Sequence, residues 1–379
     1  MIINSVYDVT FSLNGFELLN TKTASGFTAT IVEDIMSGFP ICQVTFTSSM
    51  EFLNNHPIVD GSIMHFSINN KIYNTKEDYT FRVSNVTAIP NGQLVLFSID
   101  GFLDFYEFFR NANKYATFGL SSEVFKSVAE ANNLQYDIDQ TNDKQIWIPS
   151  EINVCTWLNL IAEHGWIDHT SCMIWFIDKF KKLSYKDISN AFYTSKNKKV
   201  FKFGAINASD AKKSDYKYKT LNFNMNTGLE NVKSGYNGNN HHFDLLSYHE
   251  ITQNANKVRS ITEIININKE LSQGLSEGFM EIDTGNFHPN YFMAESQNKR
   301  IRGTLSTFAS LGCEYTMPIR LGEIVTLEPV SNGTQNLLIK SLNCQYVVSS
   351  LKTNINEVSV NMEVTLCTQG YNGRSQETY

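Results

Sequence analysis

The stretch Trp147–Asp187, WIPSEINVCTWLNLIAEHGWIDHTSCMIWFIDKFKKLSYKD, carries the clearest local pattern in the sequence. Asn153 is the expected N-cap of a helix over residues 153–164, since its side-chain oxygen can accept from the free N–H groups of the first turn. Gly165 is expected to close the helix in the left-handed conformation, which glycine adopts without a steric penalty. The helix itself is predicted by apolar residues that recur every three or four positions, namely Val154, Trp157, Leu158 and Ile161.

The second half of this stretch predicts a β-hairpin. Residues 172–177 are apolar and β-prone, residues 178–182 form the expected turn, and residues 183–185 form the returning strand. A helix followed by a hairpin indicates a small α+β domain.

The same order of elements resembles the middle segment of the phage tail baseplate hub family. That family includes the central hub proteins of myophages, late-control tail proteins and the N-terminal part of type VI secretion spike proteins. Its pattern, S-D-x-x-F-L-x-R-L-A-E-x-x-G-x-x-F, is similar to W-L-x-x-I-A-E-x-G followed by F-x-D-x-x-x-x-L-x-Y-x-D in this chain. Asn159 replaces the usual Arg, and one spacer residue is missing before Gly165. An amphipathic helix before a hairpin also occurs in unrelated α+β domains, which is the alternative interpretation.

Length and composition indicate a globular protein of two or three domains. The chain has 379 residues and a net charge of −7, which argues against general nucleic-acid binding because that needs a basic surface. We expect no signal peptide and no membrane segment, since no long apolar run is present. We expect reduced, structural cysteines in a protein made in a reducing cytosol, because none of the six forms a C-x-x-C pair: Cys42, Cys155, Cys172, Cys313, Cys344 and Cys367.

Residues 1–111 are predicted to form an N-terminal β-barrel. Short strands joined by tight turns are typical of a small barrel or sandwich, and in the hub family this region is a barrel that forms part of a ring. Asn69-Asn70 and Pro90-Asn91-Gly92 are the expected turns, and Asn-Gly is a strong hairpin signal. The β-prone runs lie at residues 27–32, 41–47, 62–68, 80–89 and 94–99.

Two segments have a biased composition with two interpretations each. Gly101–Arg110 (GFLDFYEFFR) is either a short helix covering an open end of the barrel or a contact between subunits, because aromatic residues and Arg are enriched at interface cores. Lys196–Lys219 is locally basic and is either a nucleic-acid patch or a solvated face. The solvated face is favoured, because aromatic residues are not interleaved as stacking platforms.

Residues 112–190 are predicted to form an α+β middle domain. It combines the 153–164 helix and the hairpin with a helix over residues 120–134. Ser121 is the expected cap of that helix, and Glu123 favours the dipole of its first turn. The expected buried face consists of Val124, Phe125, Val128 and Ala131.

Residues 191–379 are predicted to form a second β-barrel, with a long irregular insertion at about 222–300 and a weak helical pattern over 262–275. The phrase MPIRLGEIVTL (Met317–Leu327) is similar to L-x-x-G-D-x-V-x-L, which opens the closing strands of the second barrel in the hub family. Strands are expected at residues 305–315, 324–327, 337–340, 344–349 and 358–366, the last with alternating buried and wet side chains. The expected fold class is therefore α+β, mainly antiparallel β, with two small β-barrels and an α+β insert between them.

The sequence offers little catalytic chemistry. It contains no H-E-x-x-H, G-x-S-x-G, phosphate-binding or dinucleotide-binding motif. His241, His242 and Asp244, with His249 and Glu250 after them, could ligate a metal, but neighbouring side chains on a strand point to opposite faces, and a polar loop is the favoured interpretation. Glu163-His164 sits at a helix end with no nucleophile beside it. A pair of glycosidase carboxylates is not singled out. We therefore predict no catalytic, cofactor-binding or metal-binding residue, no cofactor and no enzyme activity.

The resemblance implies a structural baseplate hub in the virion, assembled in the host bacterial cytoplasm. It implies a homotrimer whose two barrels per chain make a pseudo-sixfold ring between the tail tube protein and a separate central spike protein, with other baseplate or tape-measure proteins as neighbours. DNA would pass through the lumen without specific binding, and an acidic lumen would favour this by repulsion. The alternative is a β-rich tail module that binds host surface glycan.

Overall fold

The computed structural model divides the chain into two compact units, each of which is described by itself. Unit 1 contains residues 1–105, 312–321 and 350–364, and unit 2 contains the remainder. The domain boundaries predicted at residues 111 and 190 stay a prediction. The structure describes residues 2–3, 7–19, 24–49, 51–71, 74–149, 152–190, 201–205, 215–224, 239–244, 249–254, 278–280, 288–305, 307–314, 319–328, 345–357 and 359–368.

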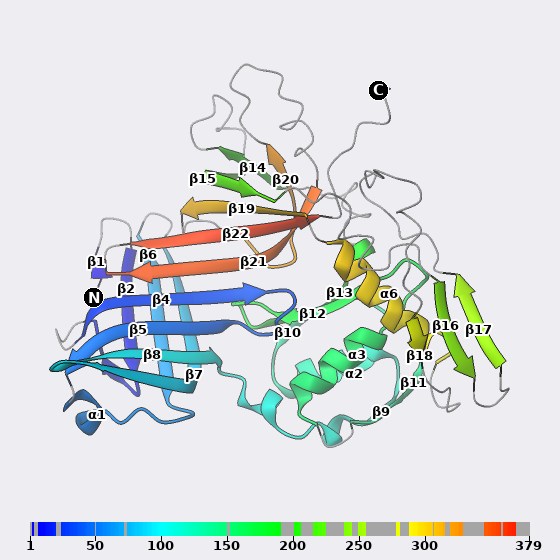
Figure 1. Ribbon diagram of the computed structural model, residues 1–379, viewed down its shortest axis with the longest axis horizontal. Coiled ribbons are helices and arrows are strands. Elements are labelled where there is room, and N and C mark those ends of the chain that lie inside the picture. Colours follow the sequence, from blue (N-terminus) through cyan, green and yellow to red (C-terminus); the bar gives the residue numbers. More distant parts are fainter. Residues whose placement is uncertain are drawn as a thin grey trace, which may run out of the picture. The chain divides into compact units, whose positions relative to one another are not determined.

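Unit 1 is a closed six-stranded barrel (Figure 1). Its strands pair in the order β2-β6-β7-β8-β5-β4, and the second half of β21 (Gln345–Asn356) pairs antiparallel with β4. Short elements β1 (Ile2–Ile3), β3 (Phe16–Glu17) and α1 (Glu51–Asn55) complete the unit. The strand bounds are β2 Tyr7–Leu13, β4 Ser25–Asp34, β5 Ile41–Ser49, β6 Ile63–Asn70, β7 Thr75–Asn91 and β8 Leu94–Leu103.

The interior of the barrel is filled by phenylalanine rings. Alternation along the strands turns every second side chain inward, and the ring centroids of Phe11 and Phe66 lie 4.6 Å apart, those of Phe46 and Phe97 5.2 Å apart. All four side chains are fully buried. The barrel is therefore a packed core, not a pore.

The predicted strands of this unit are confirmed with longer bounds, whereas one predicted turn is wrong. Asn69 and Asn70 pair with Lys76 and Thr75 inside the β6–β7 ladder, so the chain turns after them. The β7–β8 hairpin is confirmed, but its turn comes later than expected. Pro90 and Asn91 pair with Val95 and Leu94, which leaves a two-residue loop whose first residue, Gly92, has φ +64°. β2 was not predicted, although it alternates buried and half-buried residues along its whole length.

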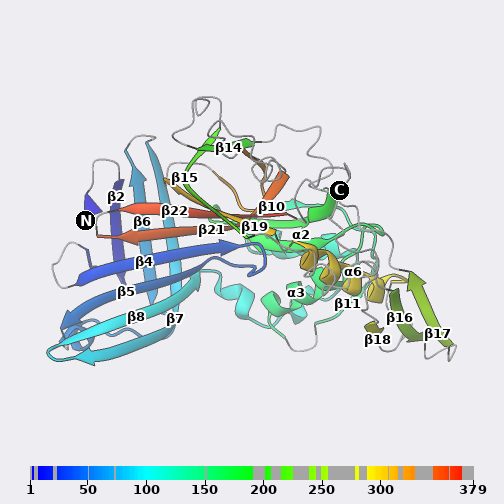
Figure 2. The ribbon, with the colours of Figure 1, turned by 45° about the horizontal axis from the view of Figure 1, so that its top comes forward.

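The centre of unit 2 is a three-stranded sheet packed on helices (Figure 2). The sheet has the order β10-β13-β12, with β10 parallel and β12 antiparallel to β13. A two-stranded ribbon, β9–β11, lies beside it in the chain. The bounds are β9 Thr117–Gly119, α2 Ser121–Ala131, β10 Gln135–Ile138, β11 Gln145–Trp147, α3 Val154–His164, β12 Met173–Ile177 and β13 Lys182–Asp187.

Three predicted details of the helices are wrong. The N-cap of α2 is Leu120, whose N–H donates to Glu123, and Ser121 instead points into the core. Ala131 is exposed, and Ala129 is buried in its place. Gly165 has φ −66°, so it is not left-handed. The N-cap role of Asn153 is confirmed, because its side chain accepts from the N–H of Thr156 at 2.8 Å.

The aromatic segment after β8 contributes to unit 2. Tyr106–Phe109 forms a 3-10 helix that packs on α3, with Phe108 fully buried and Tyr106 exposed. A second 3-10 turn covers Asn113–Tyr115. The prediction of a short helix is confirmed, but its contact is with α3.

The remaining strands of unit 2 depart from a purely antiparallel pattern. β14 (Phe201–Ala205) pairs parallel with both β15 (Tyr216–Phe223) and β20 (Ile324–Glu328). Inside the predicted irregular insertion, β16 (Asn239–Asp244) pairs with β17 (His249–Asn254) and β18 (Gly278–Met280). The predicted helix at 262–275 and strand at 337–340 lie outside the described residues.

A helix begins inside the range predicted as an irregular insertion, about 222–300. This helix, α6 (Tyr291–Thr304), precedes β19 (Thr307–Glu314), and β22 (Val360–Thr368) closes the described chain. Val360, Met362 and Val364 are buried while Asn361 is exposed, so the alternation predicted for the last strand is confirmed.

Candidate functional site

Tyr185, a residue of the hairpin motif that carried the resemblance, lies in a buried packing site of unit 2. The Tyr185 ring stacks on Phe125 with centroids 3.8 Å apart, and its hydroxyl lies 3.0 Å from the hydroxyl of Ser121. Ser121 in turn donates to the buried carboxylate of Asp143, which also accepts the backbone N–H groups of Ser121 and Trp166. This carboxylate is therefore satisfied by its donors, as a buried charge has to be.

Both motif glycines are required by close approach. A Cβ on Gly165 would lie 1.9 Å from the hydroxyl oxygen of Tyr185, and a Cβ on Gly322 would lie 2.6 Å from the Phe176 ring. Gly322 also has φ +76°. The contact of Gly322 with Phe176 joins the two stretches of sequence, 147–187 and 317–327, from which the resemblance was inferred.

The helix α6, which the sequence pattern did not reveal, anchors this site through side-chain hydrogen bonds to backbone. The amide of Asn298 donates to the carbonyls of Ala162, Glu163 and Gly165 at 2.8–3.2 Å, and its oxygen accepts the N–H of Met173. Four unpaired backbone groups, three of them at the C-terminus of α3, are satisfied by this one buried side chain.

Two further α6 side chains hold the start of β12 and the residues just before it. The amide of Gln297 donates to the carbonyl of Ser171 at 2.6 Å, and the guanidinium of Arg302 donates to the carbonyl of Met173 at 2.6 Å. An asparagine, a glutamine and an arginine on a helix of low apolar content look solvent-exposed in a sequence, so only their tertiary partners identify them.

The histidine predicted as a weak catalytic candidate is structural. His164 is buried and stacks on Tyr291 with centroids 3.7 Å apart. Its carbonyl accepts a hydrogen bond from Nε2 of His288, while Nδ1 of His288 accepts the N–H of Asn290. This pattern fits only the neutral ring of His288, and burial lowers the pKa of that ring against the raising effects of the His164 carbonyl and Asp143.

The last aspartate of the hairpin motif is a buried carboxyl. Asp187 accepts the N–H groups of Cys172 at 2.8 Å and Ser189 at 3.0 Å. Burial raises its pKa to about 7, against the opposing effect of these hydrogen bonds. Asp178, the other motif aspartate, accepts the N–H groups of Phe180 and Lys182 and so fixes the hairpin turn.

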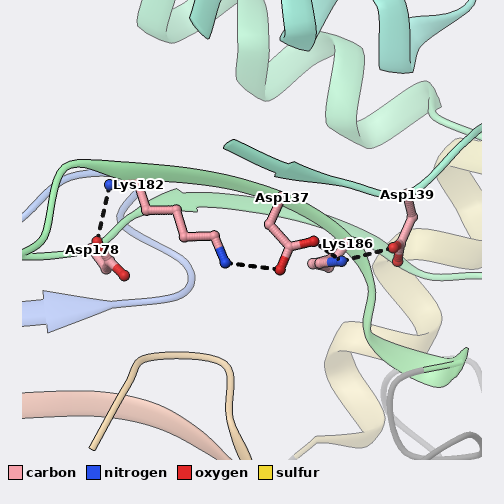
Figure 3. Close-up of polar contacts among 5 residues, drawn as sticks. All are labelled: Asp137, Asp139, Asp178, Lys182 and Lys186. Carbon is pink, nitrogen blue, oxygen red and sulfur yellow. Dashed lines mark hydrogen bonds and ion pairs between the residues drawn. The ribbon is translucent and has the colours of Figure 1, made fainter. Parts of the chain in front are cut away.

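The outer face of the hairpin carries a ladder of charges (Figure 3). Asp137 on β10 lies between Lys182, 2.9 Å away, and Lys186 on β13, and Lys186 also contacts Asp139 at 2.8 Å. Although burial would raise the pKa of Asp137, hydrogen bonds from Lys186 and Lys182 hold it below its ordinary value. Two cations and two anions neutralise one another here, so the ladder fixes the parallel pairing of β10 on β13.

The other residues considered from the sequence do not gather into a site. His241, His242 and Asp244 lie on β16, and His249 and Glu250 lie on β17, so these histidines belong to a paired hairpin, not a loop. Within the described part of the chain, no cluster of three metal-ligating side chains is found. Lys217 and Lys219 are exposed on β15, as a solvated face requires.

The described cysteines are free thiols. Cys42, Cys172, Cys313 and Cys367 are buried free thiols, and Cys155 is half-buried. Burial raises the pKa of Cys172 to about 12 and that of Cys155 to about 11, so neither is an activated nucleophile. No described helix is long and apolar enough to span a bilayer.

Comparison with solved structures finds the same architecture over nearly the whole chain. A 43 kDa tail protein of prophage MuSo2 from Shewanella oneidensis aligns with a TM-score of 0.54 at 8% identity, covering 96% of this chain and 97% of its own. The tail protein from Neisseria meningitidis MC58 aligns with a TM-score of 0.56 at 8% identity, covering 95% and 96%. The chain has the fold of these two tail proteins. No protein-family model and no curated protein sequence matches it.

The resemblance predicted from residues 147–187 is thus confirmed at the level of the fold. The fold class, mainly β with an α+β part, is confirmed with it. At 8% identity, side chains are not transferable between these tail proteins and this chain.

Proposed function

We propose that this protein is a structural component of a phage tail, the baseplate hub. In this proposal three copies form a pseudo-sixfold ring that joins the tail tube protein to the central spike, with other baseplate or tape-measure proteins around it. DNA passes through the ring during ejection, and the protein resides in the virion. The observation that carries the proposal is the agreement of fold with two tail proteins over more than nine-tenths of all three chains.

The packed barrel supports a channel formed between copies. Fully buried rings such as Phe11, Phe46 and Phe97 leave no passage along the barrel axis. A conduit for DNA therefore has to be enclosed by several chains, which is what a ring of copies provides.

The use of the motif residues for packing supports a role without catalysis. Asp178 and Asp187 accept backbone N–H groups, and Tyr185, Gly165 and Gly322 are fixed by close contacts. A general acid or nucleophile needs access to a substrate, and these groups face the interior or a turn.

The decisive experiment is the native mass of the purified full chain, alone and co-expressed with neighbouring tail proteins, together with negative-stain images. We expect particles of three times 43.1 kDa with a central hole. A ring that forms only with a partner also supports the hub and indicates that the spike templates it. A persistent monomer in both conditions would overturn the proposal, and glycan binding would then be tested on arrays. Lysis of cell walls by the pure chain would overturn the non-catalytic role.

A further inference from the structure

The hairpin of β7 and β8 continues past the end of the β6–β7 ladder (Figure 2). β6 pairs with Thr75–Arg82 on one edge of β7, whereas β8 pairs with the other edge to the end of the strand. The last bonds on the β6 side are at Val83, whose N–H donates to the carbonyl of Ser62 and whose carbonyl accepts the N–H of Gly61. Beyond Val83, no described strand pairs with this edge of β7. We call residues 84–91 the β7 arm, and this edge its open edge.

The β7–β8 register shows which backbone groups of the β7 arm point to its open edge. The two-residue turn closes on the pair Asn91–Leu94, and such a pair exchanges both of its backbone hydrogen bonds. Along an antiparallel strand the backbone groups of successive residues face the two edges alternately. The open edge therefore carries the N–H and C=O groups of Val86 and Ala88 and the carbonyl of Pro90, because proline has no N–H.

Apolar side chains are uncovered on both faces of the β7 arm. Ala88 pairs with the fully buried Phe97 and therefore lies on the inner side of the hairpin, yet Ala88 is exposed. Pro90, two residues further on, is exposed on the same side. On the outer side, Ile89 and its cross-strand neighbour Leu96 are both exposed. An open edge flanked by exposed apolar side chains is typical of a segment that another chain covers in an assembly.

The β7 arm lacks the charges that commonly keep a further strand from pairing with an open edge. Residues 84–93 contain no Asp, Glu, Lys or Arg. β10, an edge strand of unit 2, instead carries Asp137, which forms ion pairs with Lys182 and Lys186. Charges on an edge oppose the docking of another strand, because docking would remove them from water. By this criterion β10 is protected against strand addition and the β7 arm is open to it.

The same features define what can occupy the open edge. An extended segment would pair with the backbone groups of Val86 and Ala88, and a charge beside the uncharged arm would lose hydration without gaining a counter-charge. Pro90 ends the run of donors, so the pairing is short and has to be part of a larger contact. A second copy could present this same edge only across a two-fold axis, and a ring of three copies has no such axis.

We propose that the open edge of the β7 arm takes up an extended, uncharged segment of another tail protein by strand addition in the assembled tail. This inference rests on the proposed function, because the threefold ring excludes pairing of the arm with itself and the tail supplies the partner. Backbone hydrogen bonds would hold the segment, and the exposed side chains of Ala88 and Ile89 would contact its two faces.

Amide hydrogen exchange at single-residue resolution tests this inference on the smallest ring that forms and on complete tails. The N–H groups of Val86 and Ala88 face the open edge, whereas those of Thr87 and Ile89 face β8 and serve as internal controls. We expect Val86 and Ala88 to exchange roughly tenfold or more slowly in complete tails than in the ring, because a docked strand accepts their N–H groups. The exchange of Thr87 and Ile89 should be the same in both.

Two results would overturn this inference while the ring stands. Equal exchange of Val86 and Ala88 in the ring and in complete tails would show that no strand docks on the arm. Slow exchange of both amides already in a ring made of this chain alone would assign the edge to a second copy. Failure to form any ring would overturn the proposed function as well.

A pair of variants tests the backbone contact itself. Ala88→Pro removes an N–H from the open edge without removing a bond to β8, and Pro90 shows that proline is accepted on this edge. In competition with the wild-type chain, Ala88→Pro should enter complete tails about tenfold less often, while its ring forms normally. Ala88→Ser keeps the N–H and is the matched control, which should enter tails as the wild type does. Equal incorporation of the two variants would contradict strand addition.

The identity of the docked segment is tested by cross-linking in complete tails. Gln93→Cys places a thiol at the exposed turn of the arm, where it is labelled with a photoreactive maleimide, and labelling of the wild-type chain is subtracted. The cross-linked peptide should be an uncharged segment of a different tail protein. A cross-link to a second copy of this chain, or to a highly charged segment, would overturn the assignment.

Discussion

The barrel of unit 1 and the helix–hairpin core of unit 2 are stabilised in different ways. In the barrel, inward-facing rings such as Phe66, Phe81 and Phe97 are fully buried, and the ladder supplies the backbone hydrogen bonds. In unit 2, buried polar side chains satisfy the backbone. Asn298 bonds to the end of α3 and to β12, and Asp187 accepts the N–H groups of Cys172 and Ser189.

This difference determines how each region should respond to substitution. Truncating a buried side chain of the barrel should lower the free energy of unfolding in proportion to the volume removed, because its neighbours are apolar. A polar anchor in unit 2 contributes little net energy when intact but leaves several buried groups unpaired when removed. All four tryptophans, Trp147, Trp157, Trp166 and Trp175, are buried in unit 2, so tryptophan fluorescence reports that unit alone.

The largest effect is expected in the barrel. Phe66→Ala should destabilise it by about 3–5 kcal/mol, because a fully buried ring in contact with Phe11 and Phe81 is replaced by a cavity. Urea unfolding followed by far-ultraviolet circular dichroism measures this loss. Ser67→Ala, the next and outward-facing residue, is the control and should change the midpoint little. An equal shift in tryptophan fluorescence would show that the two units unfold together, against the contrast drawn here.

Removing the polar anchor Asn298 should lower the free energy of unfolding by somewhat less. Asn298→Ala should destabilise unit 2 by about 3 kcal/mol, since three carbonyls and one N–H lose their partner in a buried place. Urea unfolding followed by tryptophan fluorescence is the measurement. Asn142→Ala removes an exposed asparagine of unit 2 and should be neutral. If Asn298→Ala left the free energy of unfolding unchanged, water would have replaced the amide, and α6 would not be an anchor.

A smaller effect tests the close approach at the end of α3. Gly165→Ala should destabilise by about 1–3 kcal/mol, because its Cβ meets the hydroxyl oxygen of Tyr185. Tyr185→Phe removes that oxygen, so the double variant should lose less than the sum of the two single variants in thermal unfolding. Additive losses would indicate that Gly165 is required for some other reason.

The last effect is a change in the pH dependence of stability, measured as a slope and not at one pH. The folded-state pKa of Asp187 is raised to about 7 from 3.8, so the folded protein binds more protons between these values. The stability linked to this carboxyl is full below about pH 4 and is lost as pH rises through about 7. Asp187→Asn keeps an oxygen for Cys172 and Ser189 and should remove this fall, flattening the profile by up to about 1 kcal/mol per pH unit.

His288 provides the contrast within the same measurement. Its lowered pKa makes stability fall as pH drops below its unfolded value, the opposite sense to Asp187. The difference between wild type and Asp187→Asn isolates the carboxyl from this background. An unchanged profile in unfolding experiments from pH 5 to 8 would show that the Asp187 carboxyl is not protonated near neutrality.

Sequence patterns predicted the structure correctly where the spacing of apolar side chains matched a helix or a strand. The α3 face with its Asn153 cap, the 172–185 hairpin, the barrel strands and the alternation of β22 follow from periods of 3.6 and 2. The same reasoning failed where a residue had two common uses. Gly165 was expected to be left-handed and is instead a place of close approach, and Ser121 was expected to cap a helix and instead meets Asp143 and Tyr185.

The sequence by itself determined the two kinds of region, an alternating barrel and a helix–hairpin core, because burial of a periodic apolar face is a local property of the chain. Only the tertiary structure decided that α6 anchors that core through Asn298 and that Gly322 packs on Phe176. These contacts join residues far apart in sequence, and their partners are backbone groups or cross-strand neighbours, which leave no periodic signal.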